Sequence, residues 1–216
     1  MANPARKITN TGTKKNIGKF ASHKTGSIVP YESHLERDYI YFLEIDPDVV
    51  NYVGQPWKLN YYLDGKPKKY TPDFFVERRT KKQVIEVKPA QKAQSEKYQT
   101  LFRKVTPICA LAGWEFLVVT DEMIRVEPRL SNIKILHKYS RVQYSLQDLI
   151  TCKNYLQKSE PITILQAEQI LKPQGINRQV IFRLLYSGFL QTDLMKPICS
   201  SSLIQMTQKL GNFSSN

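Results

Sequence analysis

Hydrophobic and polar positions follow a helical period in one stretch near the start of the chain and strand-like periods soon after it. Apolar side chains on one helical face predict a helix over 33–45, which Pro47 ends; they are Leu35, Tyr39, Phe42 and Leu43. Short apolar runs then predict strands over 53–59 and 60–63, the second of which ends in the turn Asp64-Gly65.

Two further apolar runs surround a charged turn and predict a β-hairpin, with strands over 74–78 and 83–87 joined by 79–82. A long helix over 91–112 follows, stopped by Gly113, and then a buried strand over 114–119. Helices that alternate with strands in this order predict an α/β domain over 32–128.

The pattern changes near Pro128, where we place a domain boundary. Beyond it, short helical segments are separated by proline and glycine, and strand-like pieces come last. We expect helices over 146–157, 164–171 and 177–188, and strands over 189–193 and 202–206. Three helices and a two-stranded ribbon suggest a small winged-helix-like domain over 129–216.

Composition narrows the kind of partner. The chain has 216 residues, and 32 Lys and Arg against 19 Asp and Glu leave a formal charge of +13, which favours a polyanion such as double-stranded DNA. Hydrophobic content of 41% is too high for a disordered protein. We expect no membrane span, and three scattered cysteines form neither a disulfide framework nor a zinc pattern, so we expect a cytoplasmic protein.

Residues 1–31 form a segment with six basic residues and no acidic side chain before Tyr31. One interpretation is a solubilising tail; the other is a basic arm that lies along DNA phosphates. Under the second interpretation, the candidate DNA contacts are Lys14, Lys15, Lys19 and Lys24.

The predicted hairpin brings three charged residues together. Its strands run antiparallel, so Asp73 at the start of the first comes near Glu86 and Lys88 at the end of the second. Side chains alternate along a strand, so Glu86 and Lys88 point to the same face. Whether Asp73 shares that face depends on the strand register, which the sequence leaves open.

Two neighbouring carboxylates raise each other's pKa unless a cation lies between them. Mg²⁺, or Mn²⁺ in its place, binds oxygen ligands, so Asp73, Glu86 and the Val87 carbonyl are candidate ligands, and Lys88 is a candidate catalytic residue for phosphodiester hydrolysis. The alternative is ordinary: Glu86 and Lys88 on the solvated face of an edge strand, and Asp73 as a strand-start residue.

Glu36 on the first predicted helix has two interpretations. It lies on a mostly apolar side, where a metal or a water network would relieve the cost of a buried carboxylate. Alternatively, Ser33 and Glu36 have the spacing of a capping box, and Glu36 reaches back to the helix start.

Several stretches resemble a known family. Pro72-Asp73 followed by Glu86-Val87-Lys88 resembles the PD-(D/E)xK nuclease motif. The upstream stretches resemble the TnsA family, the endonuclease subunits of heteromeric cut-and-paste transposases; they are Gly18-Lys19-Phe20, Tyr31 to Tyr39, Asp46-Pro47-Asp48-Val49 and Gln55-Pro56. The resemblance implies a restriction-endonuclease-like mixed sheet flanked by helices.

The resemblance also implies functional roles. Glu36, Asp73 and Glu86 would bind Mg²⁺ and Lys88 would assist in nicking the 5′ ends of the transposon. A TnsB-type transposase and a TnsC-type ATPase would be partners. Another PD-(D/E)xK nuclease, or a catalytically silent DNA-binding assembly subunit, remains as an alternative. Gln55 is expected as a buried amide at a strand end rather than as a site residue.

The third helix of the second domain has a small basic surface. Arg178 and Arg183 are candidate DNA contacts, because the helix could enter a groove as a recognition helix. Its strongly apolar opposite side favours a docking module for partner subunits with some contact to the DNA backbone.

Overall fold

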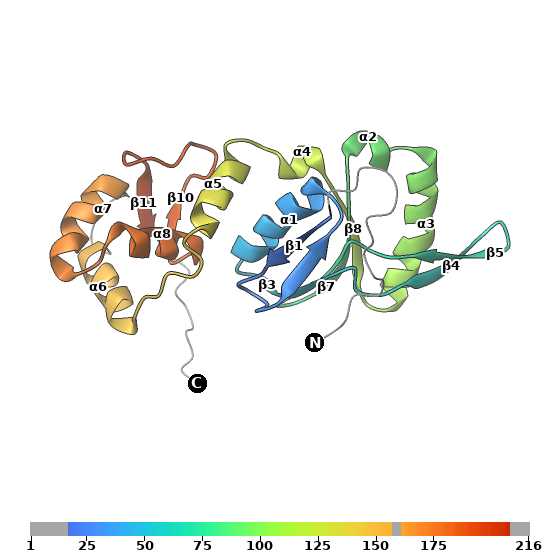
Figure 1. Ribbon diagram of the computed structural model, residues 1–216, viewed down its shortest axis with the longest axis horizontal. Helices are drawn as coiled ribbons and strands as arrows, with labels where there is room; N and C mark the ends of the chain where they lie inside the picture. Colours follow the sequence, from blue (N-terminus) through green and yellow to red (C-terminus); the bar gives the residue numbers. More distant parts are fainter. Residues whose placement is uncertain (1–16, 157–160, 208–216) are drawn as a thin grey trace. The chain divides into compact units, whose positions relative to one another are not determined.

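A computed structural model describes residues 17–156 and 161–207 of the chain (Figure 1). The chain divides into two compact units, one ending at Val126 and the other beginning at Glu127. Two of the predicted DNA contacts, Lys14 and Lys15, lie outside the described residues.

The first unit is built on a mixed four-stranded sheet of order β3-β6-β7-β8. β6 pairs antiparallel with β3 and with β7, whereas β7 and β8 are parallel. The strands are β3 (Val49–Gly54), β6 (Phe74–Arg78), β7 (Lys82–Lys88) and β8 (Glu115–Thr120). The expected mixed sheet flanked by helices is therefore present.

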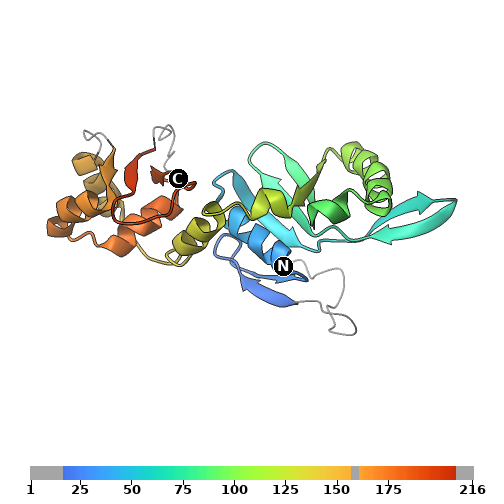
Figure 2. The same cartoon turned by 90° about the horizontal axis from the view of Figure 1, so that it is seen from above.

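Helices cover both faces of this sheet, as Figure 2 shows. On one face, α1 (His34–Ile45) packs Ile40 and Leu43 against Phe74 and Ile85. On the other face, α3 (Glu96–Leu111) packs Val105 and Cys109 against the buried side chain of Val84. Successive residues of β7 thus point into two separate cores, as the alternation along a strand requires.

Two hairpins and two short helices complete the first unit. A hairpin of β1 (Gly18–Ala21) and β2 (Ile28–Tyr31) buries Phe20 and Val29 in the α1 core. A second hairpin of β4 (Leu59–Leu63) and β5 (Lys66–Tyr70) projects from the unit in both ribbon views. The short helices are α2 (Ala90–Ala93) and α4 (Asp121–Ile124).

The second unit combines helices with a small antiparallel sheet of order β10-β11-β9. Its strands are β9 (Ile162–Thr163), β10 (Leu190–Thr192) and β11 (Leu203–Met206). Its helices are α5 (Arg129–His137), α6 (Leu146–Leu156), α7 (Ile164–Leu171), the short 3-10 helix η1 (Lys172–Gln174) and α8 (Arg178–Tyr186), which Asn177 caps.

Several elements differ from the sequence prediction. The strand expected over 53–59 is wrong: β3 ends at Gly54, because Gln55 adopts a left-handed φ of 49° and Pro56 follows. The helix expected over 91–112 is two helices, separated where Ser95 is extended.

Part of the segment expected as a basic arm folds into β1 and β2, which bury Phe20 and Val29 in the core. In the second unit, the expected two-stranded ribbon has a third strand, β9, and α5 was not predicted.

Candidate active site

The strand register, which the sequence left open, brings Asp73 to Glu86. Phe74 pairs with Ile85, so Asp73 stands opposite Glu86 and both project to the face that α3 covers. The backbone N–H of Val87 donates to Oδ2 of Asp73 at 2.8 Å, which fixes the carboxylate. Asp73, Glu86 and Lys88 therefore converge, as predicted.

The ammonium of Lys88 lies between the two carboxylates. Its Nζ atom is 2.7 Å from Oε1 of Glu86 and 3.5 Å from Oδ2 of Asp73. It is also 3.4 Å from the Val87 carbonyl oxygen and 5.6 Å from the centre of the Tyr98 ring on α3. The oxygens of Asp73, Glu86 and Val87, which we predicted from the sequence as metal ligands, thus already surround the positive charge of Lys88.

The alternative of a solvated edge strand is wrong. β7 has β6 on one side and β8 on the other, so it is an interior strand. The Glu86 side chain is only 3% exposed. An interior strand with a buried glutamate needs a specific partner for that charge.

The electrostatics show a cluster with a surplus of negative charge. Burial, and next the charge of Glu86, raise the pKa of Asp73 well above its ordinary value. Burial opposes the charged form of Lys88, yet Asp73 and Glu86 together raise its pKa above the usual range. One ammonium therefore does not compensate the carboxylates fully, and a further cation would stabilise them.

A residue that sequence reasoning missed holds Glu86 in place. The hydroxyl of Tyr70, the last residue of β5, donates to Oε2 of Glu86 at 2.6 Å. Burial and then the Glu86 charge raise the pKa of Tyr70, so the hydroxyl keeps its proton as a donor. Its place three residues before Asp73 was a signal in the sequence, but Tyr70 pairs with Leu59 in the β4–β5 hairpin, whereas the pairing of β6 with β7 places Asp73.

Glu36 reaches back to the start of α1, as the capping interpretation predicts. Ser33 is the N-cap of α1, and its hydroxyl accepts from the Glu36 N–H at 3.1 Å and donates to Oε1 of Glu36 at 2.9 Å. The Glu32 N–H donates to Oε2 of Glu36 at 2.7 Å. Both carboxylate oxygens therefore have partners at the start of the helix.

Glu36 also acts on the cluster through its charge. Burial raises the pKa of Glu36, while its hydrogen bonds and the Lys88 ammonium oppose that rise. Its negative charge in turn raises the pKa of Asp73. Among the described residues, no group of three His, Cys, Asp or Glu side chains is arranged to hold a metal ion, and a role for Glu36 as a metal ligand stays a prediction.

The donor set nevertheless fits Mg²⁺. The available atoms are all oxygens, two of them from carboxylates, and this ion commonly needs only one or two protein carboxylates because it keeps several waters. The carboxylates already gather around the Lys88 ammonium, and burial and then the charge of Glu86 raise the pKa of Asp73. Both observations favour binding of a divalent cation.

The other predicted DNA contacts have different placements. The ammonium of Lys24 donates to the carbonyls of Asp46 and Val49 just past α1, the latter at 2.9 Å, and its role in DNA binding stays a prediction. Lys19 is exposed on β1. Its role in DNA binding stays a prediction.

In the second unit, the two arginines of α8 have intramolecular partners. Arg178 forms an ion pair with Glu168 at 3.3 Å and lies over the Phe182 ring. Arg183 lies over the rings of Tyr144 and Tyr186. Most of α8 is buried, so its contact surface for a ligand is limited to one narrow side.

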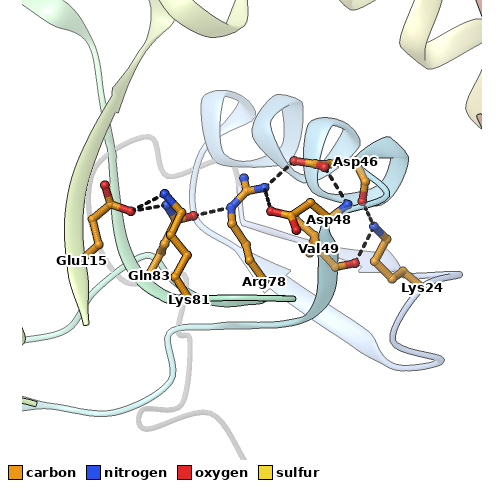
Figure 3. A network of polar contacts seen from close by, with 8 residues as sticks. All are labelled: Lys24, Asp46, Asp48, Val49, Arg78, Lys81, Gln83 and Glu115. Atoms are coloured by element: carbon orange, nitrogen blue, oxygen red, sulfur yellow. Dashed lines mark hydrogen bonds and ion pairs between the residues drawn. The ribbon is translucent and has the colours of Figure 1, made fainter. Parts of the chain in front are cut away.

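A separate polar network fixes the opposite end of the sheet (Figure 3). Arg78 donates to Asp46 at 2.7 Å, to Asp48 at 3.2 Å and to Gln83 at 2.6 Å. Gln83 in turn donates to Glu115 on β8 at 2.7 Å. This network joins the end of α1 to three strands and holds the sheet on which the Asp73 cluster is built.

Gln55 lies next to the cluster through its backbone. Its N–H donates to the Asp73 carbonyl at 2.9 Å, and its side chain is buried. The left-handed φ of Gln55 turns the chain from β3 toward this bond. It is a buried residue at a strand end, as expected.

Comparison with known families gives a match within the first unit. Residues 46–121 match the family described as TnsA-like endonuclease N terminal. This part of the chain is similar to TnsA-like endonuclease domains. The match spans the sheet and includes Asp73, Glu86 and Lys88, whereas Glu36 lies before it.

A comparison with curated proteins gave no significant match. Among the described residues, no helix has the length and apolar character needed to cross a membrane.

Proposed function

We propose that the chain is a Mg²⁺-dependent DNA endonuclease subunit of a heteromeric transposase, which cleaves the 5′ ends of the transposon in cut-and-paste transposition. The observation that supports this most is the convergence of Asp73 and Glu86 on the Lys88 ammonium, inside a domain that matches TnsA-like endonucleases.

Asp73, Glu86 and the Val87 carbonyl would hold the Mg²⁺, or Mn²⁺ as a substitute. When bound, the ion would polarise the scissile phosphate and lower the pKa of a water molecule. Tyr70 positions Glu86 through its hydrogen bond, and the Val87 N–H positions Asp73.

Lys88 and Glu36 have distinct roles in the proposal. The Lys88 ammonium orients the attacking water and offsets negative charge that builds on the phosphate in the transition state. Glu36 holds the start of α1 and adds negative charge to the cluster, which strengthens its attraction for a cation.

The partners follow from the proposed reaction. The substrate is double-stranded DNA at the transposon ends. A TnsB-type transposase would cut and join the 3′ ends, and a TnsC-type ATPase would control the complex. The second unit, with three helices α6 to α8 and a small antiparallel sheet, is proposed to be a winged-helix-like domain.

The buried character of α8 favours docking of partner subunits over groove reading by this second unit. Arg178 and Arg183 would then contribute at most DNA backbone contacts, since both are held by side chains of their own unit.

The test is strand-specific cleavage in a reaction reconstituted with the transposase and ATPase partners. With a labelled transposon end, the wild-type chain should nick the 5′ strand, and Glu86→Ala should abolish this nick while 3′ cleavage by the partner persists. Unchanged 5′ nicking by Glu86→Ala would overturn the proposal.

Two other results would identify the alternatives. Specific cleavage without any partner would indicate a different PD-(D/E)xK nuclease. A silent assembly subunit would show no 5′ nick, and its Mn²⁺ binding by calorimetry would not differ between the wild type and Glu86→Ala.

A further inference from the structure

The β4–β5 hairpin is a basic ribbon that the core does not explain. Residues 58–70 contain four lysines and one acidic residue, Asp64 at the turn; the lysines are Lys58, Lys66, Lys68 and Lys69. All four lysines are exposed. Within the described parts of the chain, none of them pairs with a carboxylate.

The pairing within the ribbon separates an inner face from an outer one. Leu59 and Tyr61 are half-buried and pack in the aromatic core beneath α3. On the other face, Asn60 stands opposite Lys69 and Tyr62 opposite Pro67, and all four are exposed. Tyr62 is 68% exposed and shares this outer face with Lys69, whereas Lys66 and Lys68, which are also exposed, pair with Leu63 and Tyr61 and flank the free edge of β5 from the other face.

Aromatic contacts anchor the base of the ribbon. Trp57, just before β4, lies 4.7 Å from the Phe75 ring and 5.1 Å from the Trp114 ring, measured between centroids. At the far end, Asp64 and Gly65 have φ of 52° and 70°, which makes a tight two-residue turn. A fixed base and a short turn produce a slender ribbon that presents its lysines in a constant position.

The ribbon ends at the cluster of Asp73, Glu86 and Lys88. Its last residue, Tyr70, donates to Glu86, and Asp73 follows three residues later. From Tyr70 back to Lys66 the strand covers about 14 Å at ~3.4 Å per residue. This length corresponds to about four base pairs of duplex DNA.

We propose that the β4–β5 ribbon is a DNA-binding element that holds the duplex phosphates next to the cleavage site. A two-stranded ribbon fits the major groove, and lysine, asparagine and tyrosine side chains are common phosphate contacts. The duplex then lies along the Lys66–Lys69 side and avoids the acidic tip. This inference rests on the proposed nuclease function for its substrate, but DNA binding can be measured without cleavage.

The test compares matched variants of the full chain in EDTA, which prevents cleavage. Binding of a short fluorescein-labelled DNA duplex is followed by anisotropy over a series of salt concentrations. The test variant is Lys68→Ala with Lys69→Ala. The control is Lys81→Ala with Lys82→Ala, which removes the same charge at the other end of β7, where both lysines are exposed.

If two phosphate contacts are lost, affinity of the test variant should fall by about tenfold or more near 0.1 M salt, and the slope of log K against log salt should become shallower by about 1.8. The control should keep the wild-type slope. Asp64→Asn should bind more tightly than the wild type, a gain that a folding defect would not produce.

The proposal would be overturned if the test variant and the wild type had equal slopes of log K against log salt. It would also be overturned if both double variants lost DNA affinity equally, or if the wild-type chain did not bind the duplex. Failure of the nuclease function would look different: the ribbon-dependent binding would remain, but no 5′ nick would appear when Mg²⁺ and the partners are supplied.

Discussion

The Nζ atom of Lys88 lies 2.7 Å from Oε1 of Glu86, two residues earlier on the same strand face. A buried carboxylate and an ammonium at this distance form a charge-assisted hydrogen bond. The ammonium occupies the point where the carboxylates of Glu86 and Asp73 converge, and we assign it a role in catalysis rather than in metal binding.

Replacing Lys88 by methionine should therefore separate the two properties. In Lys88→Met, the 5′ nicking rate should fall by about 10²–10³ because charge on the transition state is no longer offset. Mn²⁺ binding, measured by calorimetry, should persist or become tighter, since a competing positive charge is gone. Loss of Mn²⁺ binding from a folded variant, or an unchanged nicking rate, would contradict this role.

Tyr70 should act as a positioning residue for Glu86. Tyr70→Phe keeps the ring in the aromatic core and removes only the 2.6 Å hydrogen bond to Glu86. We expect about 10- to 100-fold weaker apparent Mg²⁺ affinity, as is usual when a partner of a metal ligand is lost. The measurement is nicking rate against Mg²⁺ concentration. A Mg²⁺ dependence that coincides with the wild type would exclude this role.

The two functions of Glu36 should be separable by neighbouring substitutions. Ser33→Ala removes the N-cap of α1 and should lower the free energy of unfolding by about 1 kcal/mol in urea titrations, with nicking at saturating Mg²⁺ retained. Glu36→Gln keeps an oxygen acceptor at the helix start but removes the charge, so Mg²⁺ affinity should fall. If Glu36→Gln lowers the free energy of unfolding but leaves the Mg²⁺ affinity unchanged, Glu36 acts only as a helix cap.

Arg78 should matter for stability and not for catalysis. It lies at the end of the sheet opposite the cluster and donates to Asp46, Asp48 and Gln83. Arg78→Ala leaves these partners without a cation and should lower the free energy of unfolding by about 1–3 kcal/mol. Urea unfolding measures this loss. A large fall in nicking rate at unchanged stability would show that the network does more than hold the sheet.

Much of the fold was predictable because local signals agree with the tertiary structure. α1 has both its apolar stripe and the Ser33 cap in the sequence, and β6 and β7 are apolar runs around a charged turn. β5 was missed since lysines and Pro67 give it no apolar alternation, and only pairing with β4 makes it a strand. The break at Ser95 was missed although serine before glutamate is a common helix start.

The site was only partly predictable for a related reason. Asp73, Glu86 and Lys88 follow from short-range hairpin geometry, so sequence spacing was enough to bring them together. Tyr70 required knowledge that β5 leads straight into the cluster, and Tyr98 required the packing of α3 on the sheet. The contact of Lys24 with the carbonyls past α1 could not be predicted, because the fold and not the charge of the side chain determines it.

The most direct test of the central claim is the nicking rate of Asp73→Asn. Asparagine has the same shape and keeps an oxygen for the Val87 N–H, so the fold should remain while the charge for Mg²⁺ is lost. Asp48→Asn, on the Arg78 network, is the matched control. In the reconstituted reaction, Asp73→Asn should give no measurable 5′ nick and Asp48→Asn should nick like the wild type. Mg²⁺-dependent 5′ nicking by Asp73→Asn at the wild-type rate would contradict the account.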